Sequence, residues 1–221
     1  AFLALAELER LRVGADHVDL RVLPGPVGGF RHDSLWPRTL EERLYLRDEV
    51  LYPLCRMLPS ARTVEPGSPG LVGWGKGEYL IGLPRIMEAL RAGCRPLRFP
   101  SSVEPAQRLI TFTLREAEHH PLRNSRVVEW VAAARELQRR GWRVVVIRDT
   151  LHASEPLGDA ETMPRASLHL GHRALWYSTA TLNVGVSNGP MWVSIFMDAP
   201  TLMLRPTTNA AGGCYDDAFY A

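Results

Sequence analysis

The residues best suited to chemistry follow a predicted strand, Thr181–Val186. Asn188-Gly189-Pro190 turns this strand directly into a helix predicted over Pro190–Met197, with proline at the first helical position, where its missing N–H costs little. The unpaired amides and the dipole of such a helix start attract an anion, and Gly189 lets a phosphate approach the backbone closely. The segment therefore predicts an anion-binding turn made of Ser187, Asn188, Gly189, Pro190 and Met191.

A second group of polar residues follows the strand predicted over Arg108–Leu114. In an open α/β sheet, ligands gather outside the carboxyl ends of the strands, so Arg115, Asp149 and Ser187 are expected to line one crevice. The planar fork of Arg115 suits bidentate capture of phosphate, and a helix start beside it could hold a second phosphate oxygen. The alternative is that Arg115 pairs with Glu116 or Asp149 and only ties loops together. The candidate ligands are Arg115, Glu116, Arg123, Asn124, Ser125 and Asp149.

Strands and helices alternate through the second half of the chain. Trp142–Ile147 is almost wholly apolar, and a strand apolar on both faces is typical of a parallel sheet covered by helices. The half therefore predicts a doubly wound domain. Its elements are a strand at 108–114, a helix capped by Asn124 or Ser125 and closed by Gly141, a strand at 142–147, a helix at 167–179, a strand at 181–186, a helix at 190–197 and a strand at 201–204.

The sequence of the first half also predicts alternating helices and strands, but with a weaker pattern. Thr39 can cap a helix with Glu42 three residues on, and Gly93 can close another. We therefore expect an α/β fold of two Rossmann-like halves with parallel sheets and a cleft between them, residues 1–103 and 104–221, hinged in Pro100–Pro105. The expected elements are a helix at 2–11, strands at 19–23 and 62–65, a loop at 66–82, a helix at 83–92 and a strand at 95–99.

Composition excludes several classes of protein. The chain has 221 residues, 46% hydrophobic and 23% charged, which argues against disorder. A formal net charge of +2 gives no field that would drive binding to nucleic acid. No apolar stretch approaches the ~20 residues needed to span a bilayer. Cys55, Cys94 and Cys214 are odd in number and share no metal-like spacing, which favours a reducing, cytoplasmic compartment.

A resemblance enters with the run SNGPMWVSIFMDAPTLML, which begins at Ser187. It resembles the C-terminal donor-binding motif of bacterial glycosyltransferases of the GT-B type, with two Rossmann halves, notably the lipopolysaccharide heptosyltransferases. It departs from them at Asn188, where they usually have Ser or Thr, and at Trp192, where they have His. Arg115 is also similar in place to an essential arginine of fucosyltransferases with this architecture, which follows the first strand of their C-terminal half.

The resemblance implies transfer of a sugar, hexosyl, deoxyhexosyl or heptosyl, from a nucleoside-diphosphate sugar to a hydroxyl of a glycan, lipid or small molecule in polysaccharide biosynthesis. The expected reaction is inverting and metal-independent, needs no cofactor besides the donor, and uses Arg115 to stabilise the leaving diphosphate. The alternatives are a sugar-nucleotide epimerase or hydrolase, which would use the same diphosphate site, and a non-catalytic nucleotide-sugar binding protein. Peripheral contact with a membrane stays open.

An inverting transfer needs a general base on the acceptor hydroxyl, and the candidates lie in the first half. The segment Gly25 to Asp33 is too long for a connecting turn and too rich in glycine to be packed core. We expect Gly28, Gly29, Phe30 and Arg31 to lie over the cleft, with His32 or Asp33 as the base. No metal site is predicted, because His169 and His172, three residues apart, have no carboxylate partner in their motif.

Overall fold

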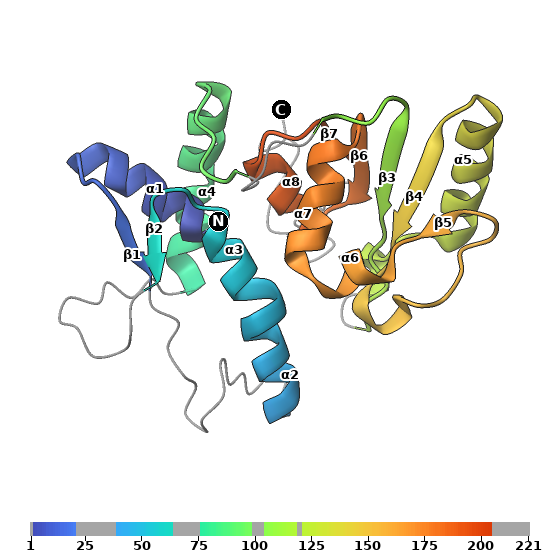
Figure 1. The fold of residues 1–221 in the computed structure, drawn as a ribbon, viewed down its shortest axis with the longest axis horizontal. Coiled ribbons are helices and arrows are strands. Elements are labelled where there is room, and N and C mark those ends of the chain that lie inside the picture. The colour runs from blue at the N-terminus through green and yellow to red at the C-terminus, as the bar shows by residue number, and fades with distance from the viewer. Residues whose placement is uncertain (1, 21–38, 64–75, 99–103, 119–120, 205–221) are drawn as a thin grey trace. The chain divides into compact units, whose positions relative to one another are not determined.

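The computed structural model describes residues 2–20, 39–63, 76–98, 104–118 and 121–204 (Figure 1). The chain divides into two compact units, Ala1–Pro100 and Ser101–Ala221, which we call the first and the second unit. The division falls inside the Pro100–Pro105 segment that the sequence marks as a hinge. Each unit has a sheet of its own.

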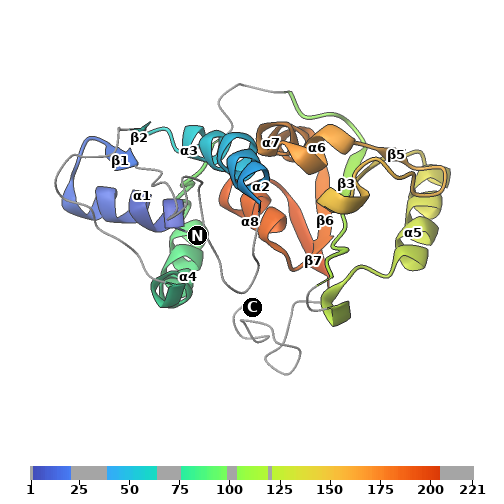
Figure 2. The same ribbon diagram turned by 90° about the horizontal axis from the view of Figure 1, so that it is seen from below.

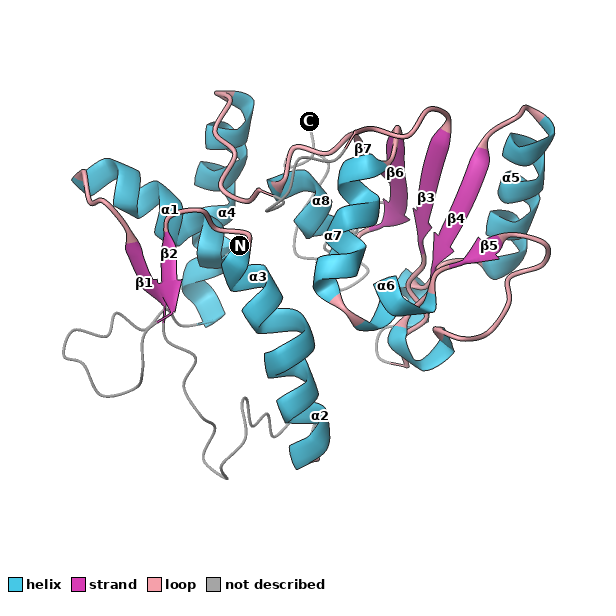
Figure 3. Ribbon diagram, viewed as in Figure 1, coloured by secondary structure: helices cyan, strands magenta, loops and turns pink. Residues whose placement is uncertain are grey.

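The second unit is built on a five-stranded, wholly parallel sheet with the order β5-β4-β3-β6-β7. From β3 the chain moves outward to β4 and β5, then returns to pair β6 against the other side of β3. The strand order therefore reverses between β3 and β6, which is the topological switch point of a doubly wound sheet. The strands are β3 (Leu109–Thr113), β4 (Arg143–Ile147), β5 (Glu161–Thr162), β6 (Leu182–Val186) and β7 (Thr201–Leu204), drawn as magenta arrows in Figure 3.

Helices lie on both faces of this sheet (Figures 1 and 2). On the face that carries α5, Phe112 meets Trp130 edge to face with ring centroids 4.8 Å apart. On the opposite face, the Thr113 and Tyr177 hydroxyls hydrogen-bond at 2.8 Å, which ties α7 to the sheet. The helices are α5 (Val127–Arg139), α6 (Pro164–Leu168), α7 (Leu170–Thr179) and α8 (Gly189–Phe196), with short 3-10 turns η2 (Pro121–Arg123) and η3 (Thr150–His152).

The parallel α/β architecture predicted for this half is confirmed, with two differences. The single helix expected over residues 167–179 is broken at His169, which adopts an extended backbone and caps α7 by accepting a hydrogen bond from the His172 N–H at 3.2 Å. Strand β5 adds an edge to the sheet between the strand expected at 142–147 and the helix expected at 167–179, where no element is predicted. It pairs through only two residues, too few to give a periodic signal.

The first unit contains a two-stranded parallel sheet. Val18 pairs with Ala61 and Leu20 with Thr63, so the chain between the strands makes a crossover. The capping box predicted at Thr39 and Glu42 is confirmed, with both reciprocal hydrogen bonds formed. The elements are α1 (Phe2–Val13), β1 (Val18–Leu20), α2 (Leu40–Tyr45), a π-helical segment η1 (Leu46–Leu51), α3 (Tyr52–Arg56), β2 (Ala61–Thr63) and α4 (Lys76–Arg91).

Two predictions for the first unit are wrong. Helix α4 begins at Lys76 and contains Pro84, although a loop is expected over residues 76–82; the segment's two glycines weaken a helix without forbidding one. Residues 95–98 form no strand. Pro96 has no N–H to donate to a neighbouring strand. The Arg98 N–H instead donates to the Met57 carbonyl at 2.7 Å.

No helix among those described combines the length and the apolar composition that crossing a membrane requires.

Candidate functional site

The candidate site lies at the switch point of the second unit. Strands β3 and β6 run side by side in parallel, and their last paired residues are Thr113 and Gly185. The chain that continues to Arg115 and the chain that continues to Ser187 therefore leave the sheet at the same edge. The two segments are joined there, because Arg123 Nη2 donates to the Ser187 carbonyl at 3.1 Å.

Arg115 is held in a tightly bonded loop and is only 5% exposed. Its backbone N–H donates to Ser125 Oγ at 3.0 Å, and the Ser125 N–H donates back to the Arg115 carbonyl at 2.8 Å. Its Nη1 donates to Asn124 Oδ1. Asn124 and Ser125 therefore do not cap α5 as the sequence predicted, because their side chains hold the Arg115 loop; Arg126 is the N-cap and makes no side-chain cap bond.

Two arginine side chains lie close enough at this edge for their charges to interact. Burial, and after it the charge of Arg123, lower the pKa of Arg115, while Asp149 acts in the opposite direction. The guanidinium still stays protonated at neutral pH. Arg123 Nε is buried and, among the described residues, has no hydrogen-bond partner. An anion bound here would relieve the repulsion and supply the missing acceptor.

The start of α8 has fewer backbone N–H donors available for this anion than the sequence predicted. Asn188 is the N-cap, and its own Oδ1 accepts the Met191 N–H at 3.0 Å. Pro190 has no N–H, so the Gly189 N–H is the backbone donor that the first helical residues leave for a ligand. Gly189 is exposed, and a Cβ placed on it would meet nothing within 4 Å. The space that a side chain at residue 189 would occupy is therefore open.

Gly185 is a structural requirement of the site that was not predicted from the sequence. A Cβ at this position would lie 2.5 Å from Met191 Sδ and 3.0 Å from the Thr113 carbonyl oxygen. Helix α8 can pack this closely on β6 only because residue 185 has no side chain. The available signal is a glycine inside a predicted strand, which marks close approach of another chain segment.

The two predicted carboxylate ligands bind other parts of the protein. Glu116 accepts a hydrogen bond from Arg148 Nε at 3.0 Å, and the side chains of this ion pair are 9% and 8% exposed. Asp149 accepts the Glu116 N–H at 3.2 Å and the Thr150 N–H at 2.8 Å. These contacts tie the loop after β3 to the loop after β4, so both residues support the Arg115 loop.

The candidate general bases and the glycine-rich loop before them belong to the first half of the chain. His32 and Asp33, and the loop residues Gly28, Gly29, Phe30 and Arg31, lie outside the described residues. Within the described ranges, no three His, Cys, Asp or Glu side chains come close enough together to hold a metal ion.

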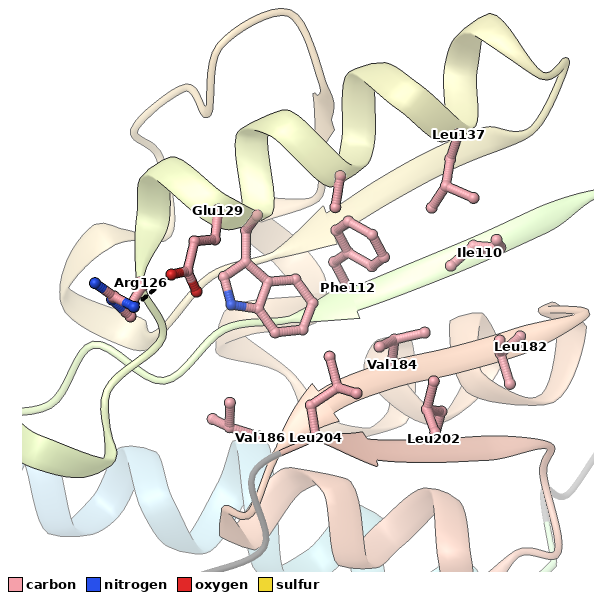
Figure 4. A pocket seen from close by; sticks show the side chains of 12 residues that line it. Ile110, Phe112, Arg126, Glu129, Leu137, Leu182, Val184, Val186, Leu202 and Leu204 are labelled. Atoms are coloured by element: carbon pink, nitrogen blue, oxygen red, sulfur yellow. Dashed lines mark ion pairs between the residues drawn. The ribbon is translucent and has the colours of Figure 1, made fainter.

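A separate apolar groove of about 550 Å³ lies on the α5 face of the second unit (Figure 4). Trp130 of α5 and Leu204 of β7 are among the apolar side chains that line it. Its polar lining residues, Arg126 and Glu129, form an ion pair at 2.5 Å. Such a lining does not suit a diphosphate, so the switch point is the better anion site.

No family model, no curated protein and no solved structure compared with the chain matches it.

Proposed function

We propose that the second unit binds the diphosphate of a nucleotide sugar at the switch point of its sheet. We further propose that the chain is a glycosyltransferase of two Rossmann-like halves. The observation that carries the proposal is the pair formed by Arg115, which is buried, and Arg123, whose Nε is buried, at the edge where β3 and β6 end.

The chemistry of the pair favours a diphosphate over a smaller anion. Two guanidinium groups can bind oxygens of two adjacent phosphates, and the Gly189 N–H adds a neutral donor from α8. A cationic pair at this place would stabilise the negative charge that grows on the leaving diphosphate as the bond to the sugar breaks. The transfer to an acceptor hydroxyl is supported by the resemblance of the segment that begins at Ser187. Under this proposal the first unit supplies the acceptor side and the base, His32 or Asp33.

Binding is tested by thermal shift with UDP, GDP, ADP, CMP and dTDP. A ligand that binds the folded chain at 100 times its Kd stabilises it by about 2.7 kcal/mol, so at least one diphosphate is expected to raise the melting temperature. The chain is then incubated with UDP- and GDP-sugars without any acceptor. Unchanged donor agrees with a transferase, whereas isomerised or free sugar would favour an epimerase or hydrolase.

Gly189→Val is expected to weaken diphosphate binding by about tenfold, or ~1.4 kcal/mol, because a side chain at this position would obstruct the close approach of a phosphate to the backbone. Its melting temperature is expected to stay close to that of the parent, since a Cβ at this position meets no neighbour within 4 Å. Calorimetric titration of the folded variant checks the affinity, and a thermal melt checks the stability. A variant that binds diphosphate as well as the parent would remove the start of α8 from the site.

A further inference from the structure

The carboxamide of Asn124 is locked in one orientation beside Arg115. The Ala117 N–H donates to Asn124 Oδ1 at 3.2 Å, and Asn124 Nδ2 donates to the Ala117 carbonyl at 2.8 Å. Because a peptide N–H can only donate and a carbonyl can only accept, these two bonds fix which end of the carboxamide carries oxygen. That same oxygen accepts from Arg115 Nη1.

We propose that Asn124 is the positioning residue of the anion site, and that it holds the Arg115 guanidinium through a neutral acceptor so that this contact does not cancel the guanidinium's charge. The inference rests on the proposed function in one respect, that a diphosphate binds at Arg115. The sequence predicted that Asn124 contacts the ligand directly. Under this proposal, Asn124 instead acts on binding by orienting Arg115.

The reason for asparagine at this position follows from the alternatives. Alanine would remove one of the contacts that order the Arg115 side chain, so the ligand would have to supply more of that order, which costs binding free energy. Aspartate would keep an acceptor for both Arg115 and the Ala117 N–H, but its charge would pair with the guanidinium and compete with an incoming anion. Asparagine orders the side chain without this competition.

The test compares stability with affinity in the full 221-residue chain. Asn124→Asp and Asn124→Ala are titrated calorimetrically with inorganic pyrophosphate, and their melting temperatures are measured without it. We expect Asn124→Asp to melt above Asn124→Ala, because the new ion pair replaces lost hydrogen bonds, yet to bind pyrophosphate at least about tenfold more weakly than the parent and more weakly than Asn124→Ala. A merely structural role predicts the opposite order, with the less stable variant binding worse. Gln138→Glu makes the same change of net charge near the other end of α5 and is expected to leave the affinity unchanged.

A double-mutant cycle keeps the test decisive even where Asn124→Asp does not fold. If Asn124 acts through Arg115, Asn124→Ala weakens pyrophosphate binding in the parent and has no further effect in Arg115→Ala. Equal effects in both backgrounds, or a folded Asn124→Asp that binds as tightly as the parent, would overturn the positioning role while leaving the anion site intact. A parent chain that binds no pyrophosphate would instead overturn the proposed function and this inference with it.

Discussion

Replacing Arg115 with alanine is expected to weaken binding of UDP or GDP to the full chain by about 1.5–3 kcal/mol, or roughly 10- to 150-fold in Kd. The substitution removes charge-assisted hydrogen bonds from a group that is 5% exposed, where water competes little. Arg115→Lys keeps the charge but loses the planar fork, so its affinity should fall between those of the parent and the alanine variant. Calorimetric titration of the three proteins measures the series.

The control for this prediction is Arg135→Ala, which makes the same change of net charge elsewhere on the second unit. Arg135 is an exposed residue of α5 that pairs with Asp159 at 3.3 Å, and its removal should not change nucleotide affinity. An Arg115→Ala variant that binds as tightly as Arg135→Ala would show that Arg115 is not a diphosphate ligand.

Gly185→Ala is expected to lower the free energy of unfolding by about 1–3 kcal/mol. Its Cβ would lie 2.5 Å from Met191 Sδ, and Met191 is fully buried, so the thioether cannot move aside into solvent. The Thr113 carbonyl oxygen at 3.0 Å belongs to the neighbouring strand and cannot yield either. Urea unfolding followed by circular dichroism measures the loss.

Gly189→Ala is the matched control, four residues further along at the first position of α8, where the added Cβ meets nothing within 4 Å. Its unfolding free energy should stay within about 0.5 kcal/mol of the parent. Should Gly185→Ala prove equally neutral, the close packing of α8 on β6 would be contradicted.

Most of the fold of the second unit could be predicted from its sequence, because its strands other than β5 are short runs rich in apolar residues, with helical segments between them. Val144, Val145, Val146 and Ile147 are all buried, as a strand covered on both faces requires. The first unit could be predicted less well. Two prolines show why. Pro96 lies where a strand was expected and no strand forms, whereas Pro84 lies inside helix α4, so the presence of proline alone did not predict the local structure.

The candidate site could be predicted as a set of positions but not as a set of roles. The rule that ligands gather at the carboxyl ends of parallel strands is enough to group Arg115 with Ser187 from the sequence alone. Sequence spacing could not show that Asn124 turns back toward Arg115, or that Asn188 uses its side chain to cap its own helix. Such roles depend on side-chain direction, which only the folded loop determines.

The central claim, that a diphosphate binds between Arg115, Arg123 and the start of α8, is tested most directly by NMR. Inorganic pyrophosphate is titrated into the 15N-labelled chain, and the backbone amide of Gly189 and the Nε–H signals of Arg115 and Arg123 are followed. We predict saturable shifts of all three signals with one common Kd. Pyrophosphate that leaves these three signals in place, whether or not it shifts others, would contradict the claim.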